Sequence, residues 1–135
     1  MSVTFDSVEE GDEIPEAERS LGKDDVREYA RVNGIDFARF TDDEGARKEG
    51  LPGMIAPGNM SMGLLATFVE RWAGAGTLRR LGTTFRGLVL PGNPITLYGV
   101  VTQKDAVART AELDVWIESH EGERVVIGTA TVQLA

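Results

Sequence analysis

Apolar and polar side chains alternate along the second half of the chain, from Leu78 to Leu134. A period of two is typical of strands that bury one face and expose the other. The alternation is clearest where Leu113, Val115 and Ile117 stand between charged or aromatic neighbours. The pattern predicts four strands, at residues 78–89, 95–103, 108–119 and 124–134, with turns at 91–94 and 120–123.

Two segments before residue 78 have the apolar pattern of helices. Residues 59–72, NMSMGLLATFVERW, are apolar on nearly every face until Glu70, which predicts a helix surrounded by protein. A second helix is predicted at residues 22–34, because apolar residues recur at i, i+3 and i+4 from Val26 and the segment ends in Asn-Gly.

The remaining segments are shorter. Residues 3–8 predict a short strand, which an acidic turn follows. Residues 42–50 predict a short polar helix with Thr41 or Asp42 as its cap. The Pro- and Gly-rich residues 51–58 predict irregular structure.

Helices and strands therefore segregate along the chain, which indicates an α+β fold. A length of 135 residues fits one ordinary domain, and no repeat or linker divides it. We expect a single domain over residues 1–135, with an antiparallel sheet of about five strands wrapped around one long buried helix.

Composition narrows the classes of function. The chain has no cysteine and one histidine, His120, which excludes disulfides and cysteine- or histidine-rich metal sites. A formal net charge of -8 argues against binding to nucleic acid. No run approaches the ~20 apolar residues that span a bilayer, and the acidic N-terminus lacks the apolar core of a signal peptide. We therefore expect a cytoplasmic protein without a metal, a nucleic-acid partner or a membrane span.

Three segments together resemble the MaoC-like hotdog dehydratases, and they cover essentially the whole chain. Residues 50–65, GLPGMIAPGNMSMGLL, are similar to the entry to that family's central helix. Residues 85–101, FRGLVLPGNPITLYGVV, are similar to its F-x-x-P-V-x-P-G-D-x-L strand pair. Residues 5–34 resemble its N-terminal strand and helix.

This resemblance implies a hotdog fold that works as a homodimer or as a heterodimer with another hotdog subunit. It also implies a pantetheine thioester ligand, carried by CoA or an acyl carrier protein, and no separate cofactor. The family's usual reaction is the reversible hydration of a 2-enoyl thioester to a 3-hydroxyacyl thioester.

The loop that carries this chemistry in the family is G-D-x-N-P-x-H-x-D, and here it corresponds to GIDFARFTDD, residues 34–43. Ile35 takes the position of the aspartate and Phe40 that of the histidine. Hydration needs one group to deprotonate water and another to deliver a proton to carbon, and neither side chain exchanges protons. The family's acid–base pair therefore does not carry over to these positions.

Replacement groups for the missing pair are few. Asp36 comes one position late, and a slip of one residue presents it as a catalytic candidate together with Ser61. The ordinary role of Asp36 is a carboxylate that caps the loop, and we favour that interpretation. His120 stands at a predicted hairpin tip, and we interpret it as an exposed turn residue.

Candidate binding residues lie in the same loop and at the start of the central helix. Phe37 and Phe40 are expected to form an apolar wall for an acyl chain, or simply to pack in the core. Free N–H groups at a helix start attract partial negative charge such as a thioester oxygen. The candidates there are Pro57, Gly58, Asn59 and Ser61. Ser61 equally fits a role as a helix cap, and Asn59 fits either a group that positions a water or a helix cap. Candidates for the CoA phosphates are Arg79, Arg80 and Arg86, which equally fit solvated strand residues.

Three functions remain open. The first is a thioester-binding subunit that lacks its own acid–base pair and works beside a catalytic hotdog, as in the heterodimeric mycolic-acid dehydratases that the family includes. The second is an active hydratase or dehydratase that uses Asp36, Asn59 and Ser61 instead. The third, a thioesterase, is less favoured, because Glu70 comes too late in the central helix to hold a water at the site.

Overall fold

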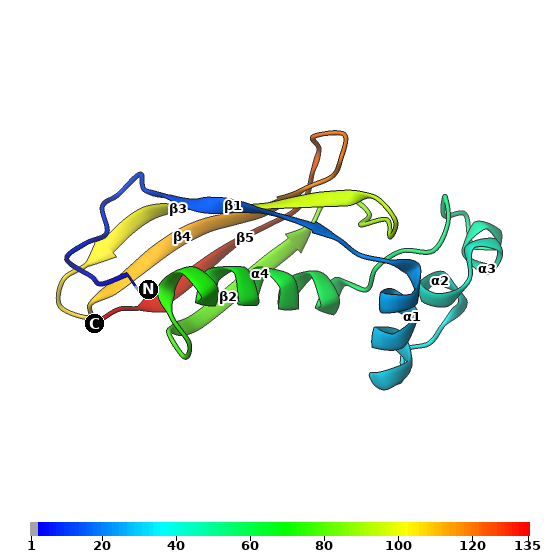
Figure 1. Cartoon of the computed structure of the whole chain (residues 1–135), viewed down its shortest axis with the longest axis horizontal. Helices are drawn as coiled ribbons and strands as arrows, with labels where there is room; N and C mark the ends of the chain where they lie inside the picture. The colour runs from blue at the N-terminus through cyan, green and yellow to red at the C-terminus, as the bar shows by residue number, and fades with distance from the viewer. Residues whose placement is uncertain (1–2) are drawn as a thin grey trace.

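The computed structural model describes residues 3–135 as a helix-and-sheet domain (Figure 1). Its elements in chain order are β1 (Glu13–Ser20), α1 (Lys23–Val32), α2 (Ala38–Thr41), α3 (Asp43–Lys48), α4 (Gly58–Ala73), β2 (Leu78–Phe85), β3 (Pro94–Asp105), β4 (Thr110–Glu118) and β5 (Arg124–Gln133). The five strands form one antiparallel sheet in the order β1-β3-β4-β5-β2. The expected α+β fold, with about five strands wrapped around one long helix, is confirmed.

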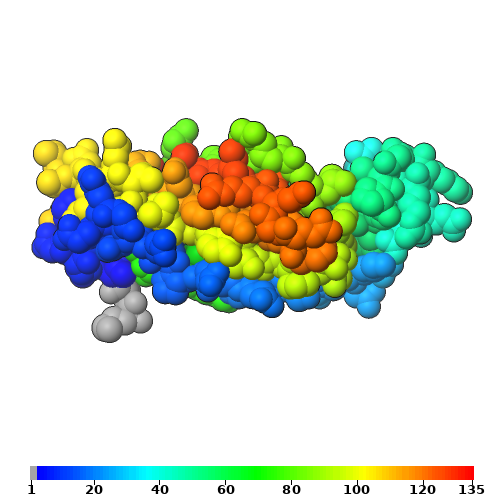
Figure 2. Space-filling model, turned by 90° about the horizontal axis from the view of Figure 1, so that it is seen from above, coloured from blue at the N-terminus to red at the C-terminus, as the bar shows by residue number. Residues whose placement is uncertain are grey.

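Helix α4 lies along one face of the sheet, and α1, α2 and α3 gather beyond one end of it (Figure 1). Seen from above, the α1–α3 segment protrudes as a separate end of the elongated molecule (Figure 2). Helix α4 therefore belongs to the core, whereas the three short helices extend past the sheet.

The core is the layer between α4 and the sheet. The alternation predicted for β4 is confirmed, because Leu113, Val115 and Ile117 are buried. They share one cluster with Leu65 and Val69 of α4. Burial of such side chains contributes about 1.5–3 kcal/mol each, which makes this layer the main source of stability.

The central helix is buried along one side rather than on nearly every face. Gly63, Thr67 and Arg71 recur at intervals of four residues and are exposed, so they mark the side that faces away from the sheet. The expectation of a helix with protein on nearly every face was wrong for a single chain, because a single sheet covers only one side of a helix.

The strand expected at residues 3–8 is not formed, and the first strand is β1 instead. Thr4 and Ser7 exchange hydrogen bonds between their hydroxyls and backbone, including Ser7 Oγ to the Thr4 carbonyl at 2.9 Å. Such local bonds give the backbone an alternative to a sheet ladder. The apolar residues in this segment nevertheless belong to the core, where Phe5 and Val8 are buried.

The other predicted elements are confirmed with shifted ends. The largest shift is at β2, which was expected to continue to residue 89 and stops at Phe85. The N–H groups of Arg86 and Gly87 both bond to the Val125 carbonyl, at 2.8 and 3.0 Å, so the chain turns out of the ladder there. Helix α2 was not predicted at all, whereas the short polar helix is α3 and is capped by Asp42, which accepts from Gly45 N at 2.9 Å.

The two edges of the sheet differ. Strand β1 has an irregularity between Ile14 and Ala17, where Pro15 removes one backbone donor. Proline and bulges at an edge discourage pairing with another chain. Strand β2 pairs with β5 alone, and its one register irregularity lies at its start, between Leu78 and Arg80. It contains no proline over its eight residues. The β2 edge is therefore the better surface for adding a further strand.

We expect Gly128→Ala to destabilise the fold. An added Cβ at Gly128 would overlap the backbone carbonyl oxygen of Gly82 on the neighbouring strand β2, which cannot move without breaking the ladder. The free energy of unfolding in urea should fall by about 1–3 kcal/mol, as in other overpacked sites.

Gly82→Ala is the matched control, because its Cβ would meet nothing within 4 Å. Its effect should stay within about 0.5 kcal/mol. Equal stability of the two variants would show that β2 and β5 are not packed as described.

Candidate functional site

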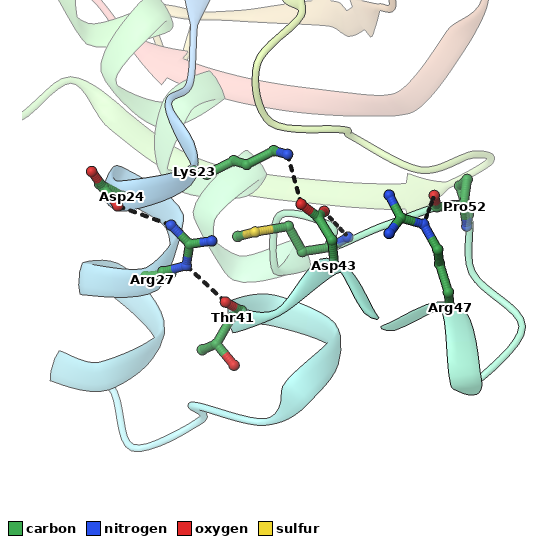
Figure 3. A network of polar contacts seen from close by, with 8 residues as sticks. Lys23, Asp24, Arg27, Thr41, Asp43, Arg47 and Pro52 are labelled. Atoms are coloured by element: carbon green, nitrogen blue, oxygen red, sulfur yellow. Dashed lines mark hydrogen bonds and ion pairs between the residues drawn. The ribbon is translucent and has the colours of Figure 1, made fainter. Parts of the chain in front are cut away.

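A polar network ties the three short helices to the chain that enters α4 (Figure 3). Lys23 Nζ at the start of α1 donates to Asp43 Oδ2 of α3 at 2.7 Å. The other oxygen of Asp43 accepts from the backbone N–H of Met54 at 3.0 Å. One carboxylate therefore joins α1, α3 and the segment before α4.

Two arginines extend this network by binding backbone carbonyls. Arg27 Nε of α1 donates to the Thr41 carbonyl at 2.7 Å, and Arg47 Nε donates to the Pro52 carbonyl at 3.3 Å (Figure 3). The effect is to hold α2, which would be too short to be stable alone, between its neighbours. Phe40, on α2, is therefore held by its surroundings.

The electrostatics of Asp43 follow from these contacts. The hydrogen bond from Lys23 and the one from the Met54 N–H lower the pKa of the Asp43 carboxyl below its ordinary value of 3.8. Both favour the charged form, and they outweigh the opposing effect of partial burial. Asp43 is therefore a structural anion that remains charged in neutral solution.

A cavity of about 280 Å³ lies at the start of α4. It is bounded by α2, the first turn of α4, the end of β2 and the loop that follows β2. The lining residues are Arg39, Phe40, Ile55, Ala56, Gly58, Ser61, Phe85, Gly87, Leu88 and Val89.

Backbone hydrogen bonds hold the two walls of the cavity in place. Ile55 N–H donates to the Arg39 carbonyl at 2.8 Å, which attaches the α2 wall to the segment before α4. Ala56 N–H donates to the Val89 carbonyl at 2.8 Å, which attaches that segment to the loop after β2. Three stretches distant in sequence thus meet at one site.

The start of α4 is built around a close approach. Pro57 is the N-cap, without a side-chain hydrogen bond, and Gly58 is the first helical residue. An added Cβ at Gly58 would lie 2.7 Å from Cζ of Phe85, so the absence of a side chain lets the phenyl ring rest on the helix start. Phe85 is 50% exposed and lines this end of the cavity.

Ser61 and Asn59 do not cap the helix, contrary to one of their two expected roles. The cap position is Pro57, and Ser61 lies one turn inside, with its N–H 3.4 Å from the Pro57 carbonyl. Ser61 is 1% exposed, the one buried polar side chain within residues 3–135, and it lines the cavity. Asn59 is exposed and lies outside the lining.

The loop at residues 34–43 divides between the cavity and solvent. Phe40 lines the cavity. The ring of Phe37 lies beside that of Phe40, with their centroids 6.4 Å apart, but Phe37 is 61% exposed. Ile35 is half-buried, and its N–H donates to the Ala30 carbonyl at 2.9 Å. Asp36 is exposed and does not line the cavity. Of the four residues, Phe40 alone borders the cavity.

Asp36 interacts instead with α1. The pKa of Arg31 is raised mainly by its hydrogen bond and charge interaction with Glu28, and to a smaller extent by the charge of Asp36. The carboxylate is therefore placed near a cation on the outer surface of the segment.

The chemistry of the cavity is that of an apolar chamber with one hydroxyl. Arg39 is the one ionisable group among the described lining residues, and its guanidinium bonds to Glu49 Oε1 at 2.8 Å. In the first turn of α4 the N–H groups of Met60 and Ser61 donate to the Pro57 carbonyl. Those of Gly58 and Asn59 have no partner within the helix. Such a site suits a hydrocarbon chain with a polar, uncharged carbonyl at one end.

Several lining residues were not singled out from the sequence, namely Arg39, Ile55, Ala56, Phe85, Gly87, Leu88 and Val89. Phe85 opens the FRGLVLPGN segment that carries the family resemblance, and this was the available signal. The three arginines considered for phosphates are exposed, and Arg86 comes directly before Gly87 at the cavity wall.

His120 does not line the cavity and lies at the turn between β4 and β5. Its side chain is 40% exposed and its Nε2 is 3.7 Å from Glu121 Oε1. It borders a neighbouring hollow of about 220 Å³, which shares Gly87, Leu88 and Val89 with the cavity. The interpretation of His120 as an exposed turn residue is confirmed.

Two further classes of site are absent from the described part of the chain. Within residues 3–135, no three His, Cys, Asp or Glu side chains come together as metal ligands. No helix in the same range is long and apolar enough to cross a membrane.

A five-stranded antiparallel sheet wrapped on one helix, with a cavity at the helix start, defines the hotdog class of domains. Within that class, the family model for the MaoC like domain matches residues 6–122, and the chain belongs to this family. No curated protein sequence matches the chain.

Solved structures share this fold. A MaoC-like dehydratase superposes with a TM-score of 0.93 at 28% identity, over 99% of this chain and 43% of its own, so the chain spans less than half of that relative. The R-hydratase PhaJ1 from Pseudomonas aeruginosa superposes with a TM-score of 0.89 at 20% identity, over 98% of this chain and 86% of its own. A chain of the ChsH1-ChsH2 complex from Mycobacterium tuberculosis superposes with a TM-score of 0.84 at 18% identity, over 100% of this chain and 100% of its own.

We expect Gly58→Ala and Phe85→Ala to be coupled in a double-mutant cycle. In the Phe85→Ala background an alanine at position 58 meets no ring and should stabilise the helix by about 0.5–1 kcal/mol. In the natural background the new Cβ must displace the ring and this gain should be lost. Urea denaturation gives the free energy of unfolding of the natural protein, the two single variants and the double variant. If the two substitutions change that free energy additively, Phe85 does not contact Gly58.

We expect Asp43→Asn to remove a stabilisation that depends on pH. The pKa of Asp43 is lowered in the folded protein, so its contribution is present above the unfolded pKa and is lost as pH falls through the folded pKa. The difference in unfolding free energy between the natural protein and the variant should therefore be largest near neutrality and shrink in acid.

Lys23→Gln is the matched control, because it removes the other partner and leaves the Met54 hydrogen bond in place. Combined with Asp43→Asn it should add little further loss. A difference that is constant from neutral to acidic pH would contradict this role for Asp43.

Proposed function

We propose that this chain is an acyl-thioester-binding subunit of the MaoC-like hydratase/dehydratase family that lacks its own acid–base pair and works beside a catalytic hotdog. Its ligand is an acyl chain linked through a thioester to CoA or to an acyl carrier protein. The chain supplies the apolar chamber, and the partner supplies the groups that move protons.

The lining of the cavity at the start of α4 carries this proposal. The loop reaches the chamber with Phe40, and neither a carboxylate nor an imidazole stands among the described lining residues. A hydration reaction needs groups that take and give protons within hydrogen-bond reach of the substrate. Phe40, Phe85 and Leu88 instead offer apolar surface, which favours binding of a hydrocarbon chain.

The groups that remain polar suit a thioester carbonyl. Ser61 presents its side chain to the chamber, and the first turn of α4 supplies backbone N–H groups at the positive end of the helix dipole. Both are neutral donors that polarise a carbonyl oxygen without exchanging a proton with carbon. They hold the ligand in place for chemistry supplied from elsewhere.

The β2 edge supports a position for the partner. An open strand edge of eight residues without proline is a surface for pairing with a second sheet. Phe85 is the last residue of this strand and also lines the cavity, so a subunit paired along β2 would reach the chamber. The structurally similar ChsH1-ChsH2 protein is itself described as a complex.

The test uses the chain alone, a hotdog subunit with an intact D-x-N-P-x-H loop, and their mixture. Hydration of crotonyl-CoA and of longer 2-enoyl-CoAs is followed by loss of the conjugated thioester absorbance. We expect no turnover by the chain alone, saturable binding of saturated acyl-CoA, and a change in chain-length preference when the partner is present.

Two variants separate this proposal from an independently active enzyme. Phe40→Asp places a charge in the apolar wall and should weaken acyl-CoA binding about tenfold or more. Asp36→Ala, on the exposed side of the same loop, should leave binding unchanged. Turnover by the chain alone that Asp36→Ala abolishes would establish the alternative, an active hydratase or dehydratase with Asp36 as its catalytic group.

A further inference from the structure

A second apolar cleft lies on the opposite half of α4, between this helix and the edge strand β1. It encloses about 290 Å³ and is lined by Val3, Ile14, Pro15, Ala17, Arg19, Phe68, Arg71 and Trp72. It shares no residue with the cavity at Ser61. Eleven residues of helix separate Ser61 from Trp72, which is roughly 16 Å along the axis. The two sites are therefore distinct.

Gly99 of β3, which has no side chain, leaves room for the residues that form the floor of this cleft. A Cβ on Gly99 of β3 would lie 2.7 Å from Ile14 Cδ1 and 3.5 Å from Phe68 Cε2. The glycine thus lets Ile14 settle toward Phe68 under the cleft, and Trp72 adds a large aromatic wall. The floor is therefore continuous and apolar. The volume of the cleft lies near the lower end of the range for small-molecule sites, ~300 Å³.

Two cations border this floor. Arg19 comes from β1 and Arg71 from the last turn of α4. Neither takes part in an ion pair with an acid of residues 3–135, although four other basic side chains (Lys23, Arg27, Arg31 and Arg39) do. Most basic side chains in this range share this lack of an ion pair, and Arg19 Nη1 donates to the Glu18 backbone carbonyl at 2.8 Å, so what sets these two arginines apart is their place beside an apolar floor.

We propose that this cleft binds a linear alkyl carboxylate, a free fatty-acid anion of medium length. Its alkyl chain lies on the Ile14–Phe68–Trp72 floor, and its carboxylate accepts hydrogen bonds from Arg19 and Arg71. Guanidinium groups match the planar carboxylate with two parallel donors. The apolar floor selects against small hydrophilic anions, and the two cations select against neutral and cationic amphiphiles.

Trp72 provides a direct readout. The chain has two tryptophans, Trp72 in the cleft and Trp116 on the outer face of the sheet, where it stacks on Tyr98 with centroids 5.3 Å apart. Trp116→Phe keeps an aromatic ring in that stack and leaves Trp72 as the single indole. Decanoate, added below its micellar concentration, should then change the Trp72 emission in a saturable way.

The arginines and the alkyl chain are tested in this background. Combined Arg19→Gln and Arg71→Gln should weaken decanoate binding about tenfold. Arg79→Gln and Arg80→Gln together make the same change of charge on β2, away from the cleft, and should leave binding unchanged. Shortening the ligand should cost about fourfold per methylene, and decanol and decylamine should bind more weakly than decanoate.

Absence of saturable binding, or equal binding by the two double variants, would overturn the proposal. Calorimetry of decanoate with the unsubstituted chain repeats the measurement if Trp116→Phe does not fold. The outcome is independent of the thioester proposal, because Phe40→Asp should weaken acyl-CoA binding and leave decanoate binding intact. Decanoate binding that is lost with Phe40→Asp would assign the fatty acid to the Ser61 cavity and overturn a separate cleft.

Discussion

The packing of one side of α4 against one face of the sheet is the contact on which the rest of the structure depends. Leu65 and Val69 on the helix and Leu113 and Val115 on β4 are buried in the same layer. Because this layer fixes the helix axis, it also fixes what lies at each end. The N-terminal end meets Phe85 and the short helices, and the C-terminal half meets β1.

The site at the N-terminal end combines a loop held in a fixed position with an apolar surface. The network around Asp43 holds α2 and the segment before α4 in place, so the loop keeps the position it needs to border the chamber. What the loop presents there is Phe40, an apolar ring. A wall of this kind favours binding over proton transfer, which is the physical basis of the proposed supporting role.

Much of the fold could be predicted from periodicity, because β4 alternates cleanly and α4 is apolar over four turns. The prediction of a strand at residues 3–8 was wrong, because hydrogen bonds between Thr4 and Ser7 compete with pairing to a neighbouring strand. A hydrophobic pattern does not reveal such bonds. In the site, Phe40, Gly58 and Ser61 were found by their place in family motifs. Phe85 and Leu88 were missed, because only the tertiary fold brings the end of β2 and its loop to the helix start.

The central claim is that the chamber binds an acyl thioester and cannot hydrate it alone. A single-turnover experiment is the most sensitive test: the chain in large excess over crotonyl-CoA, in water enriched in oxygen-18, with products read by mass spectrometry. The account predicts that the thioester is bound and recovered without oxygen-18. Labelled 3-hydroxybutyryl-CoA formed by the chain without a partner would contradict it.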